Sequence, residues 1–545
     1  MAGSAQHAAA GGERIFTRKS SGLLRTAGAW DTFIFNIGLV SVGIAIALNQ
    51  YYGPSLYPGA QIWLSTVLAG VGMLFAAATF YLWSITFPRS GGVYVSLSRS
   101  YGPGLAFVFT AVEVMILTYY AALASSLIVT VGLSSFFGTI GVVSGNSTLV
   151  GWAAAVASPE GIFWLGSLLL VLAGLLLAVG TRAYFAVQKV LFVVAILGTL
   201  VIIIVLLFGS RETFQTNLTA LTGLAYDDVI EKAKAAGWAP APFNWDQTLA
   251  FLVWPLLPLL GAVQSIGIGG EVKRVNRAQF LGMFGATIVS VVLIALVAVL
   301  SDKTFGYDFQ GAVAFNSLSG VADGSIEGVV GAAPWFTVLA GILTNSVLLT
   351  TIIMLAFVAW IWFWVPAELA YTTRTMIAWS FDGIAPEGLG NVSDRVHTPV
   401  VAIALSTAIA IVFMALIAFA KIALLTLVEV LLVIWGAAML AAVFFPFRSP
   451  SLFRLSPASG VRFAGIPVMS ITGLVAALFF LWTIVTLWND ANAAGPLISA
   501  DGVRLEFWII LGTVVAALAW YVFIKAERRR QGIDLDRAFK EIPIE

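Results

Sequence analysis

The chain has 545 residues, of which 60% are hydrophobic and only 10% are charged. Soluble domains carry about 25% charged residues, so this composition indicates a polytopic membrane protein. The 28 basic and 27 acidic residues nearly balance, which argues against a nucleic-acid partner. The absence of cysteine, with two histidines, excludes disulfides, thiolate metal sites and a histidine-ligated metal cluster, and no cofactor is expected.

Residues 1–27 are small, polar and basic and lack the apolar segment of a cleavable signal, so we expect a cytoplasmic tail. Apolar runs of about 20 residues then recur along the chain, each long enough to cross a bilayer as a helix. They predict an all-α polytopic membrane protein. Its twelve transmembrane helices are expected at residues 28–48, 61–87, 101–135, 160–181, 184–208, 247–270, 278–300, 334–366, 399–420, 422–446, 466–488 and 505–524.

Most Lys and Arg residues lie in the N-terminal tail, in every second loop between predicted spans and in residues 525–545. Because short cytoplasmic loops are enriched in Lys and Arg, this predicts that both termini are cytoplasmic. Two longer outer loops, 209–246 and 301–333, are either lids or plain connectors. The first contains "AYDDVIEKAKAAGW", a predicted surface helix.

Two of the predicted spans carry helix-breaking residues near their middles. The first, "AWDTFIFNIGLVSVGIAIAL", has Gly38, Ser41 and Gly43 there. The sixth, in "PLLPLLGAVQSIGIGGEVKR", has two prolines and Gly261, followed by Gln264. Proline removes a backbone donor, and irregular backbone at membrane depth is tolerated only where protein or a water-filled cavity satisfies it. Matched interruptions in two halves of a chain point to a central solute site, whereas single ones are commonly packing surfaces.

Four stretches in this order resemble a known family. They are "VGIAIAL" in span one, "FPRSGGVYVSLSRSYGPGLAF" between spans two and three, "GAVQSIGIGGEVKRVNR" at span six and "TRTMIAWSFDGIAPEGLGNVSDRVHTPVVAI" after span eight. The sequence resembles the amino acid–polyamine–organocation (APC) superfamily of permeases over residues 20 to about 450. The resemblance implies alternating access, a five-plus-five inverted repeat in a core at 28–446 with helices 1 and 6 discontinuous, and two accessory spans in 447–524.

The resemblance also implies where a substrate would bind. The break in span one would offer N–H groups to a carboxylate, and the break in span six would offer carbonyls to an amino group. This agrees with the polarity of helix ends. The corresponding substrate-binding residues are Gly38, Leu39, Ser41, Val42 and Gly43 in span one, and Leu256, Leu257, Leu259 and Gly261 in span six.

Several residues depart from the family pattern. Ser41 replaces the first glycine of the span-one motif, Asn276 replaces a usual proline, and leucines replace the usual aromatic residues of span six. Val263 stands where a polar or acidic residue is frequent. Apolar walls cannot satisfy a buried charged side chain, so we expect a neutral, apolar or aromatic amino acid as substrate.

Ionisable residues within spans are candidates for coupling and gating, because a charge at mid-bilayer costs at least ~2.5 kcal/mol. Glu113 in span three is expected to be either a proton carrier or a structural hydrogen-bond partner, and for Glu429 in span ten the structural role is favoured. Glu271 and Arg277 match a family motif and are predicted to form an inner-gate salt-bridge network. Glu368 is expected to pair with Arg374 near the inner interface.

The coupling ion is less determined. Many proton-coupled relatives carry a lysine well inside span five, where Ala195 stands here, and Lys189 lies nearer the cytoplasmic end. The inner half of span eight reads "AWIWFWVPAEL", without the hydroxylated residues of a sodium site. Its tryptophans either line the pathway or form a lipid-interface belt. Glu113 and the weak case for a sodium site make a proton the first choice as coupling ion, with sodium the alternative, whereas the missing span-five lysine supports an exchanger.

The sequence favours a secondary active transporter of the cell membrane, by proton-coupled symport of a neutral amino acid. An exchanger or uniporter for amino acids, and an amine transporter of the same fold, are the alternatives. A transporter-like amino-acid receptor is a weaker one, and no enzymatic activity is expected.

Overall fold

The computed structural model describes residues 22–321, 325–420, 427–490, 492, 498–499, 502–533 and 535. Within them, twelve helical segments are long and apolar enough to cross a membrane, which confirms the predicted number. In chain order they are α1 and α2 (Ala29–Val40, Val42–Leu56), α3 (Ile62–Thr86), α5 with η1 and α6 (Pro103–Leu127, Ile128–Ser134, Ser135–Ser144), α8 (Pro159–Val179), α9 (Thr181–Phe208), α12 with α13 and η2 (Trp245–Phe251, Val253–Leu259, Leu260–Gly267), α14 (Val275–Phe305), α18 (Val347–Phe381), α20 with η4 (Val400–Ala415, Leu416–Ala420), α21 (Val428–Arg448), α23 (Val468–Asn489) and α24 (Leu505–Arg530).

Local signals set where several of these helices begin. Gly102 has φ 93°, a conformation that favours glycine, and Pro103 occupies the first turn of α5, where its missing N–H costs nothing. The side chain of Ser158 accepts a hydrogen bond from the Gly161 N–H at the start of α8.

The prediction for span eight, at 334–366, was wrong at both ends. Residues Phe336–Thr344 form a separate helix, α17, which ends where Asn345 adopts a left-handed conformation with φ 43°. The span itself is the 35-residue α18, which continues through Pro366 to Phe381. The polar residues after Pro366, which suggested the membrane–water interface at the end of a span, therefore belong to α18 and are buried within the protein.

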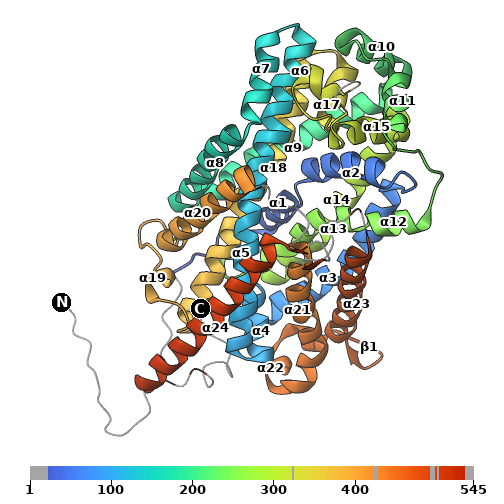
Figure 1. Ribbon diagram of the computed structural model, residues 1–545. Helices are drawn as coiled ribbons and strands as arrows, with labels where there is room; N and C mark the ends of the chain where they lie inside the picture. Colours follow the sequence, from blue (N-terminus) through green and yellow to red (C-terminus); the bar gives the residue numbers. More distant parts are fainter. Residues whose placement is uncertain are drawn as a thin grey trace.

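Shorter helices gather at the two ends of the bundle (Figure 1). One end carries α7 (Ser147–Val156), α10 (Arg211–Thr222), α11 (Tyr226–Ala235), α15 (Tyr307–Leu318), α16 (Ile326–Val330) and α17. The helix α11 confirms the predicted surface helix, whereas α15 and α16 show that 301–333 is not a simple loop. The other end carries α4 (Val93–Tyr101), η3 (Gly269–Glu271), α19 (Glu387–Gly390), α22 (Pro450–Leu455) and η5 (Pro457–Gly460).

Two short antiparallel hairpins complete the described structure. Strand β1 (Arg462–Phe463) pairs with β2 (Ile466–Pro467), and β3 (Ile498–Ser499) pairs with β4 (Gly502–Val503). The predicted start of span ten at 422 and most of the predicted tail, residues 1–21, lie outside the described residues. Helix α24 continues to Arg530, and so into the segment predicted as the C-terminal tail.

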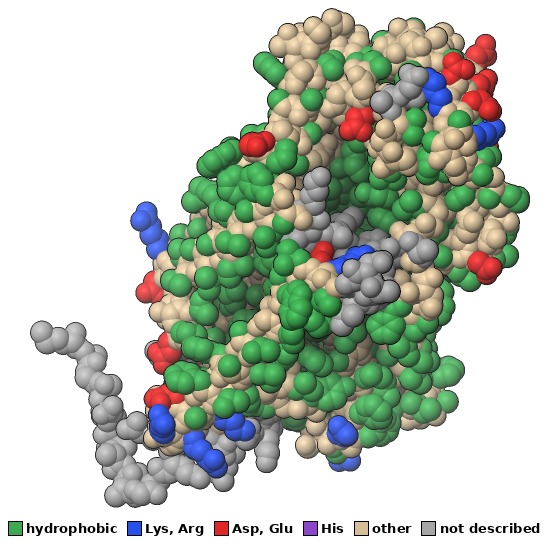
Figure 2. All heavy atoms as spheres, viewed as in Figure 1, with side chains coloured by type: hydrophobic (Ala, Val, Ile, Leu, Met, Phe, Trp, Pro, Cys, Tyr) green, Lys and Arg blue, Asp and Glu red, His purple; other side chains and the backbone are tan. Residues whose placement is uncertain are grey.

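The two spans that carry breaks lie at the centre of the bundle. Spans one and six are each 89% buried over their most apolar windows, whereas α24 is 6% buried over its own. Helix α1 packs against α14 and η2, and α18 packs against α5 and α9. Figure 2 shows a broad apolar surface around the middle, with basic side chains gathered toward the end that carries the C-terminus of α24. The broken helices are thus enclosed by the other spans.

Candidate functional site

The first span is interrupted at a single residue. Ser41 adopts a left-handed conformation, with φ 49° and ψ 66°, between α1 and α2. This conformation costs an ordinary residue roughly 1–2 kcal/mol. The Ser41 hydroxyl donates a hydrogen bond to the Trp360 carbonyl at 2.9 Å, which offsets part of that cost. Because α2 restarts at Val42, the first N–H groups of that helix have no carbonyl partner within it.

The sixth span changes helix type instead of stopping. Helix α13 contains Pro258 and gives way at Leu260 to the 3₁₀ segment η2, which runs for eight residues. Runs of 3₁₀ helix longer than three or four residues are uncommon, and within a helix they often mark a hinge. Proline supplies no N–H, so the Trp254 carbonyl one turn earlier lacks its usual helical donor. The sequence pattern had placed both interruptions at these positions.

The two interruptions touch each other. A Cβ on Gly261 would lie 2.4 Å from the Leu39 carbonyl carbon and 2.6 Å from its oxygen, so only glycine allows this approach. One turn further along η2, Asn36 and Ser265 form two hydrogen bonds. The Asn36 amide donates to the Ser265 hydroxyl at 2.9 Å, and the Ser265 N–H donates to the Asn36 side-chain oxygen at 2.8 Å. The centre of the bundle is therefore a direct junction of two broken helices.

Side chains from α18 pack against this junction. A Cβ on Gly38 would meet the Phe363 ring, and one on Gly43 would meet Phe357 and Trp360. The remaining predicted substrate residues are buried around the same junction: Leu39, Ser41, Val42, Leu256, Leu257, Leu259 and Gly261. The structure thus brings the nine together, with aromatic rings against the two glycines of span one.

The tryptophans of α18 differ in exposure. Trp360 and Trp364 are 1% and 6% exposed, whereas Trp362 is half-buried. The first two therefore face the protein interior and are not part of a lipid-interface belt.

Glu113 is fully buried in α5 and accepts two hydrogen bonds at one oxygen. The Trp435 indole donates to its Oε1 at 2.8 Å, and the Tyr371 hydroxyl donates to the same atom at 3.0 Å. Its other oxygen, Oε2, has no hydrogen-bond partner among the described residues. A buried carboxyl group without a cation beside it is costly in its charged form.

Glu368 is a second buried carboxyl group, and its expected pairing with Arg374 was wrong. It lies inside α18 because that helix runs past Pro366. Its Oε1 accepts hydrogen bonds from the Trp364 indole at 2.8 Å and from the Gln264 amide at 3.2 Å, while Oε2 has no partner among the described residues. Gln264 belongs to η2, so Glu368 is linked to the broken half of span six.

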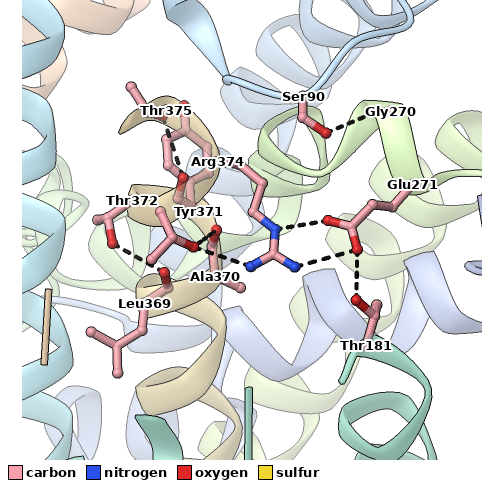
Figure 3. Close-up of polar contacts among 11 residues, drawn as sticks. Ser90, Thr181, Gly270, Glu271, Leu369, Ala370, Tyr371, Thr372, Arg374 and Thr375 are labelled. Atoms are coloured by element: carbon pink, nitrogen blue, oxygen red, sulfur yellow. Dashed lines mark hydrogen bonds and ion pairs between the residues drawn. The ribbon is translucent and has the colours of Figure 1, made fainter. Parts of the chain in front are cut away.

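Arg374 instead forms a buried ion pair with Glu271 (Figure 3). The Arg374 Nε donates to Glu271 Oε1 at 2.7 Å, and the Thr181 hydroxyl donates to Glu271 Oε2 at 2.9 Å. The partner of Glu271 here is not the predicted Arg277, which is exposed at the start of α14. The pair connects η3 to α18, with α9 beside it.

The loop before α4 closes around this ion pair. The Gly91 N–H donates to the Gly267 carbonyl at 3.1 Å, and the Gly270 N–H donates to the Ser90 hydroxyl at 3.2 Å. A Cβ on Gly92, whose φ is 57°, would collide with the Tyr371 hydroxyl. These contacts hold the loop tightly against span six and α18.

A second buried pair lies at the same end, where Arg99 Nη1 is 3.0 Å from Asp382 Oδ2. We call the end held by Glu271–Arg374 and Arg99–Asp382 the ion-paired end.

Aromatic rings close the opposite end of the junction. Tyr52 of α2 stacks on Trp254 of α13 with centroids 4.2 Å apart, and the Tyr51 and Trp335 rings lie 4.3 Å apart. We call the end held by these four residues the aromatic end. Sequence reasoning missed this cluster, because Trp254 and Trp335 are far from Tyr51 and Tyr52 along the chain. The one local signal was the adjacent pair "YY" in the second half of α2.

Glu429, the last of the predicted coupling residues, contacts α23 in the structure. It is in the first turn of α21, and its Oε2 accepts a hydrogen bond from the Trp488 indole of α23 at 2.7 Å. This contact links two neighbouring spans.

Comparison with known proteins agrees with this architecture. The model of the amino acid permease family matches residues 28–517. The chain is 24% identical over 541 residues to an arginine/agmatine antiporter of Chlamydia felis, covering 96% of this chain and 94% of that protein. It is also 24% identical over 387 residues to the branched-chain amino acid permease BcaP of Bacillus subtilis, covering 71% of this chain and 73% of that protein. The chain therefore belongs to the amino acid permease family, and it is a multi-pass membrane transporter, not an enzyme.

Proposed function

We propose that this protein is a secondary active transporter of the cell membrane that moves a neutral, apolar or aromatic amino acid by alternating access. The observation that supports this most is the direct contact of two broken helices at the centre of twelve spans. Helix ends at membrane depth provide unpaired backbone groups that can bind a zwitterion. The five-plus-five repeat, which would relate the two breaks, is part of the same proposal.

The walls of the junction support a neutral substrate side chain. The N–H groups at the start of α2 suit a carboxylate, because the N-terminus of a helix carries partial positive charge. Around them lie Leu39, Leu256, Leu257 and Leu259, whose side chains offer no hydrogen-bond partner. An additional charged group on the substrate would be buried there at a cost of several kcal/mol.

We further propose that the ion-paired end and both termini are cytoplasmic. Lys and Arg are concentrated in the loops and helix ends on that side, including Arg528, Arg529 and Arg530 in the last turn of α24. Asp227 and Asp228 belong to α11, which lies at the other end (Figure 1). This arrangement follows the preference of basic residues for cytoplasmic segments.

Both ends are closed in the structure, so opening either one exposes the junction to one side of the membrane. At the cytoplasmic side, the gate would be Glu271–Arg374 together with the loop at Ser90. Arg277 would belong to the same gate when the ion pair separates. At the outer side, the gate would be the aromatic end.

The proposed coupling ion is a proton carried by Glu113. This carboxyl group lies inside α5, has one unpartnered oxygen, and accepts hydrogen bonds only from neutral groups among the described residues. Protonation removes the cost of its buried charge and weakens its attraction for the Tyr371 hydroxyl. Tyr371 also contacts Gly92 and Gly267, so a change at Glu113 reaches the cytoplasmic gate.

The test is Glu113→Gln in purified protein reconstituted into liposomes. With an inward proton gradient, the wild type should accumulate L-leucine, L-phenylalanine or L-alanine, and a sodium gradient alone should not. Glu113→Gln should lose accumulation but keep exchange of internal for external substrate, because exchange needs no net proton movement. Accumulation that persists in Glu113→Gln would remove this residue from the coupling mechanism.

Exchange is the second candidate, because several similar proteins are arginine/agmatine antiporters. Ala195, where many proton-coupled relatives carry a lysine, also favours exchange. An obligate exchanger would show uptake only into liposomes preloaded with substrate, whatever the gradient. Uptake into empty liposomes would exclude obligate exchange. If L-arginine were the only amino acid exchanged, the proposal of a neutral substrate would be overturned.

A further inference from the structure

Three buried polar groups near the junction lack the hydrogen bonds that they could make. They are Oε2 of Glu368, Oε1 of Gln264 and the hydroxyl of Tyr120, none of which has a partner among the described residues. All three side chains are 4% exposed or less. Leaving such groups unpaired in a protein interior is costly, so buried polar groups almost always have a partner.

The three groups form one cluster. The Gln264 amide donates to Glu368 Oε1, and so does the Trp364 indole. The Tyr120 ring lies 6.1 Å from the Trp364 ring, which places α5 beside the same carboxyl group. These contacts use Oε1 of Glu368 and the amide nitrogen of Gln264, and they leave Oε2 of Glu368 and Oε1 of Gln264 available.

The chemistry of the available atoms selects the ligand. A carboxylate oxygen and an amide oxygen are acceptors only, and a tyrosine hydroxyl can also accept. Such a set suits a group that brings several N–H donors and a positive charge, and it would repel an anion. Among the described residues, Glu368 has no ion pair, so its charge is available for such a group.

The cluster lies close to the break in span one. Gln264 is three residues after Gly261, which touches Leu39, and its neighbour Ser265 is bonded to Asn36 of α1. On α18, Trp364 directly follows Phe363, which packs on Gly38. The cluster therefore lies beside the junction at which α2 starts, and the carboxylate and the ammonium of an amino acid, which share one carbon atom, require neighbouring partners of this kind.

From this placement we propose that Glu368 and Gln264 bind the α-ammonium group of the substrate, with the Tyr120 hydroxyl beside them. This rests on the proposed function and adds a specificity determinant to it. A side-chain carboxylate, not only span-six backbone carbonyls, would distinguish an amino acid from an acid that lacks the amino group.

The experiment compares each amino acid with its 2-hydroxy acid, which replaces the ammonium by a hydroxyl. Wild type and Glu368→Gln are reconstituted, and exchange of labelled L-leucine, L-phenylalanine, L-alanine or L-arginine is measured without ion gradients. The fastest substrate is then competed with its unlabelled amino acid or hydroxy acid. The ratio of the two inhibition constants is internal to each protein, so it does not depend on how much of a variant folds.

We expect the wild type to prefer the amino acid, and Glu368→Gln to reduce that ratio at least about tenfold, since a hydrogen bond to a charged group contributes that much or more. Glu368→Asp should keep part of the preference. Asp302→Asn is the matched control, because Asp302 accepts a hydrogen bond from Gln310 at the same 3.2 Å but lies at the far end of α14. It should leave the ratio unchanged.

Each other outcome has a definite meaning. An unchanged ratio in Glu368→Gln overturns the inference. If the ratio is unchanged but proton-driven accumulation is lost, Glu368 carries a proton and does not bind the ammonium. If the wild type exchanges none of the four amino acids, the proposed function itself fails and the inference fails with it.

Discussion

The two ends of the central junction are closed by different interactions. At the ion-paired end, Glu271 and Arg374 are 1% and 2% exposed at their side chains, and backbone hydrogen bonds join the surrounding segments. At the aromatic end, Tyr52 and Trp254 stack without a charge between them. A buried ion pair is strongly destabilised when one partner is lost, whereas an aromatic pair contributes about 0.5–1.5 kcal/mol beyond its buried area. The ion-paired end should therefore be the more sensitive to single substitutions.

The largest effect is expected from Glu271→Gln. It leaves the Arg374 charge buried without a partner, which should destabilise the closed state by about 3–5 kcal/mol. The chain has no cysteine, so a single Ile268→Cys can report opening through its rate of labelling by a membrane-impermeant maleimide. Labelling from the ion-paired end should become much faster in Glu271→Gln.

The control is the double variant Glu271→Gln with Arg374→Gln, which removes both charges. Its labelling rate should return toward the wild-type value, since no isolated charge remains. Equal labelling of the wild type and Glu271→Gln would mean that the ion pair does not hold this end closed.

An intermediate effect is expected from Gly261→Ala, at the contact between the two broken helices. Gly261→Ala places a methyl group against the Leu39 backbone, and such overpacking typically costs about 1–3 kcal/mol. The melting temperature in detergent and the exchange rate should both fall. Gly436→Ala is the matched control, because nothing lies within 4 Å of a Cβ at that helical glycine. Equal melting temperatures for the two variants would show that the two breaks are not in tight contact.

The smallest effect is expected from Trp254→Leu, which removes the stack on Tyr52 and should favour opening of the aromatic end by about 0.5–1.5 kcal/mol. A Leu257→Cys reporter, labelled from that side, measures it. Trp254→Phe loses the indole contact to the Tyr57 hydroxyl but keeps a ring stacked on Tyr52. Because the stack is kept, its labelling rate should stay near that of the wild type. A larger change here than in Glu271→Gln would reverse the comparison between the ends.

The sequence predicted the features that depend on neighbouring residues. The number of spans follows from the lengths of apolar runs, and both interruptions follow from serine, glycine and proline in the middle of such runs. These signals are local, so they can be read without knowing what packs against them.

The sequence could not predict which distant side chains meet. Glu368 was placed at an interface because Pro366 and the polar residues after it look like the end of a span, yet α18 continues and other helices cover it. Glu271 was assigned to Arg277, six positions away, whereas its partner Arg374 is about a hundred positions away. Such pairings depend on how helices are arranged, which no single segment determines.

The eight-residue η2 segment also has a length that can change. A 3₁₀ helix rises about 2.0 Å per residue and an α-helix 1.5 Å, so rewinding η2 as α-helix would shorten it by about 4 Å. One end of η2 touches Leu39 at the junction, and the other is bonded to the loop at Gly91. Span six can therefore act as an adjustable tether, which draws the loop at Gly91 toward the centre of the membrane or releases it without sliding the whole helix.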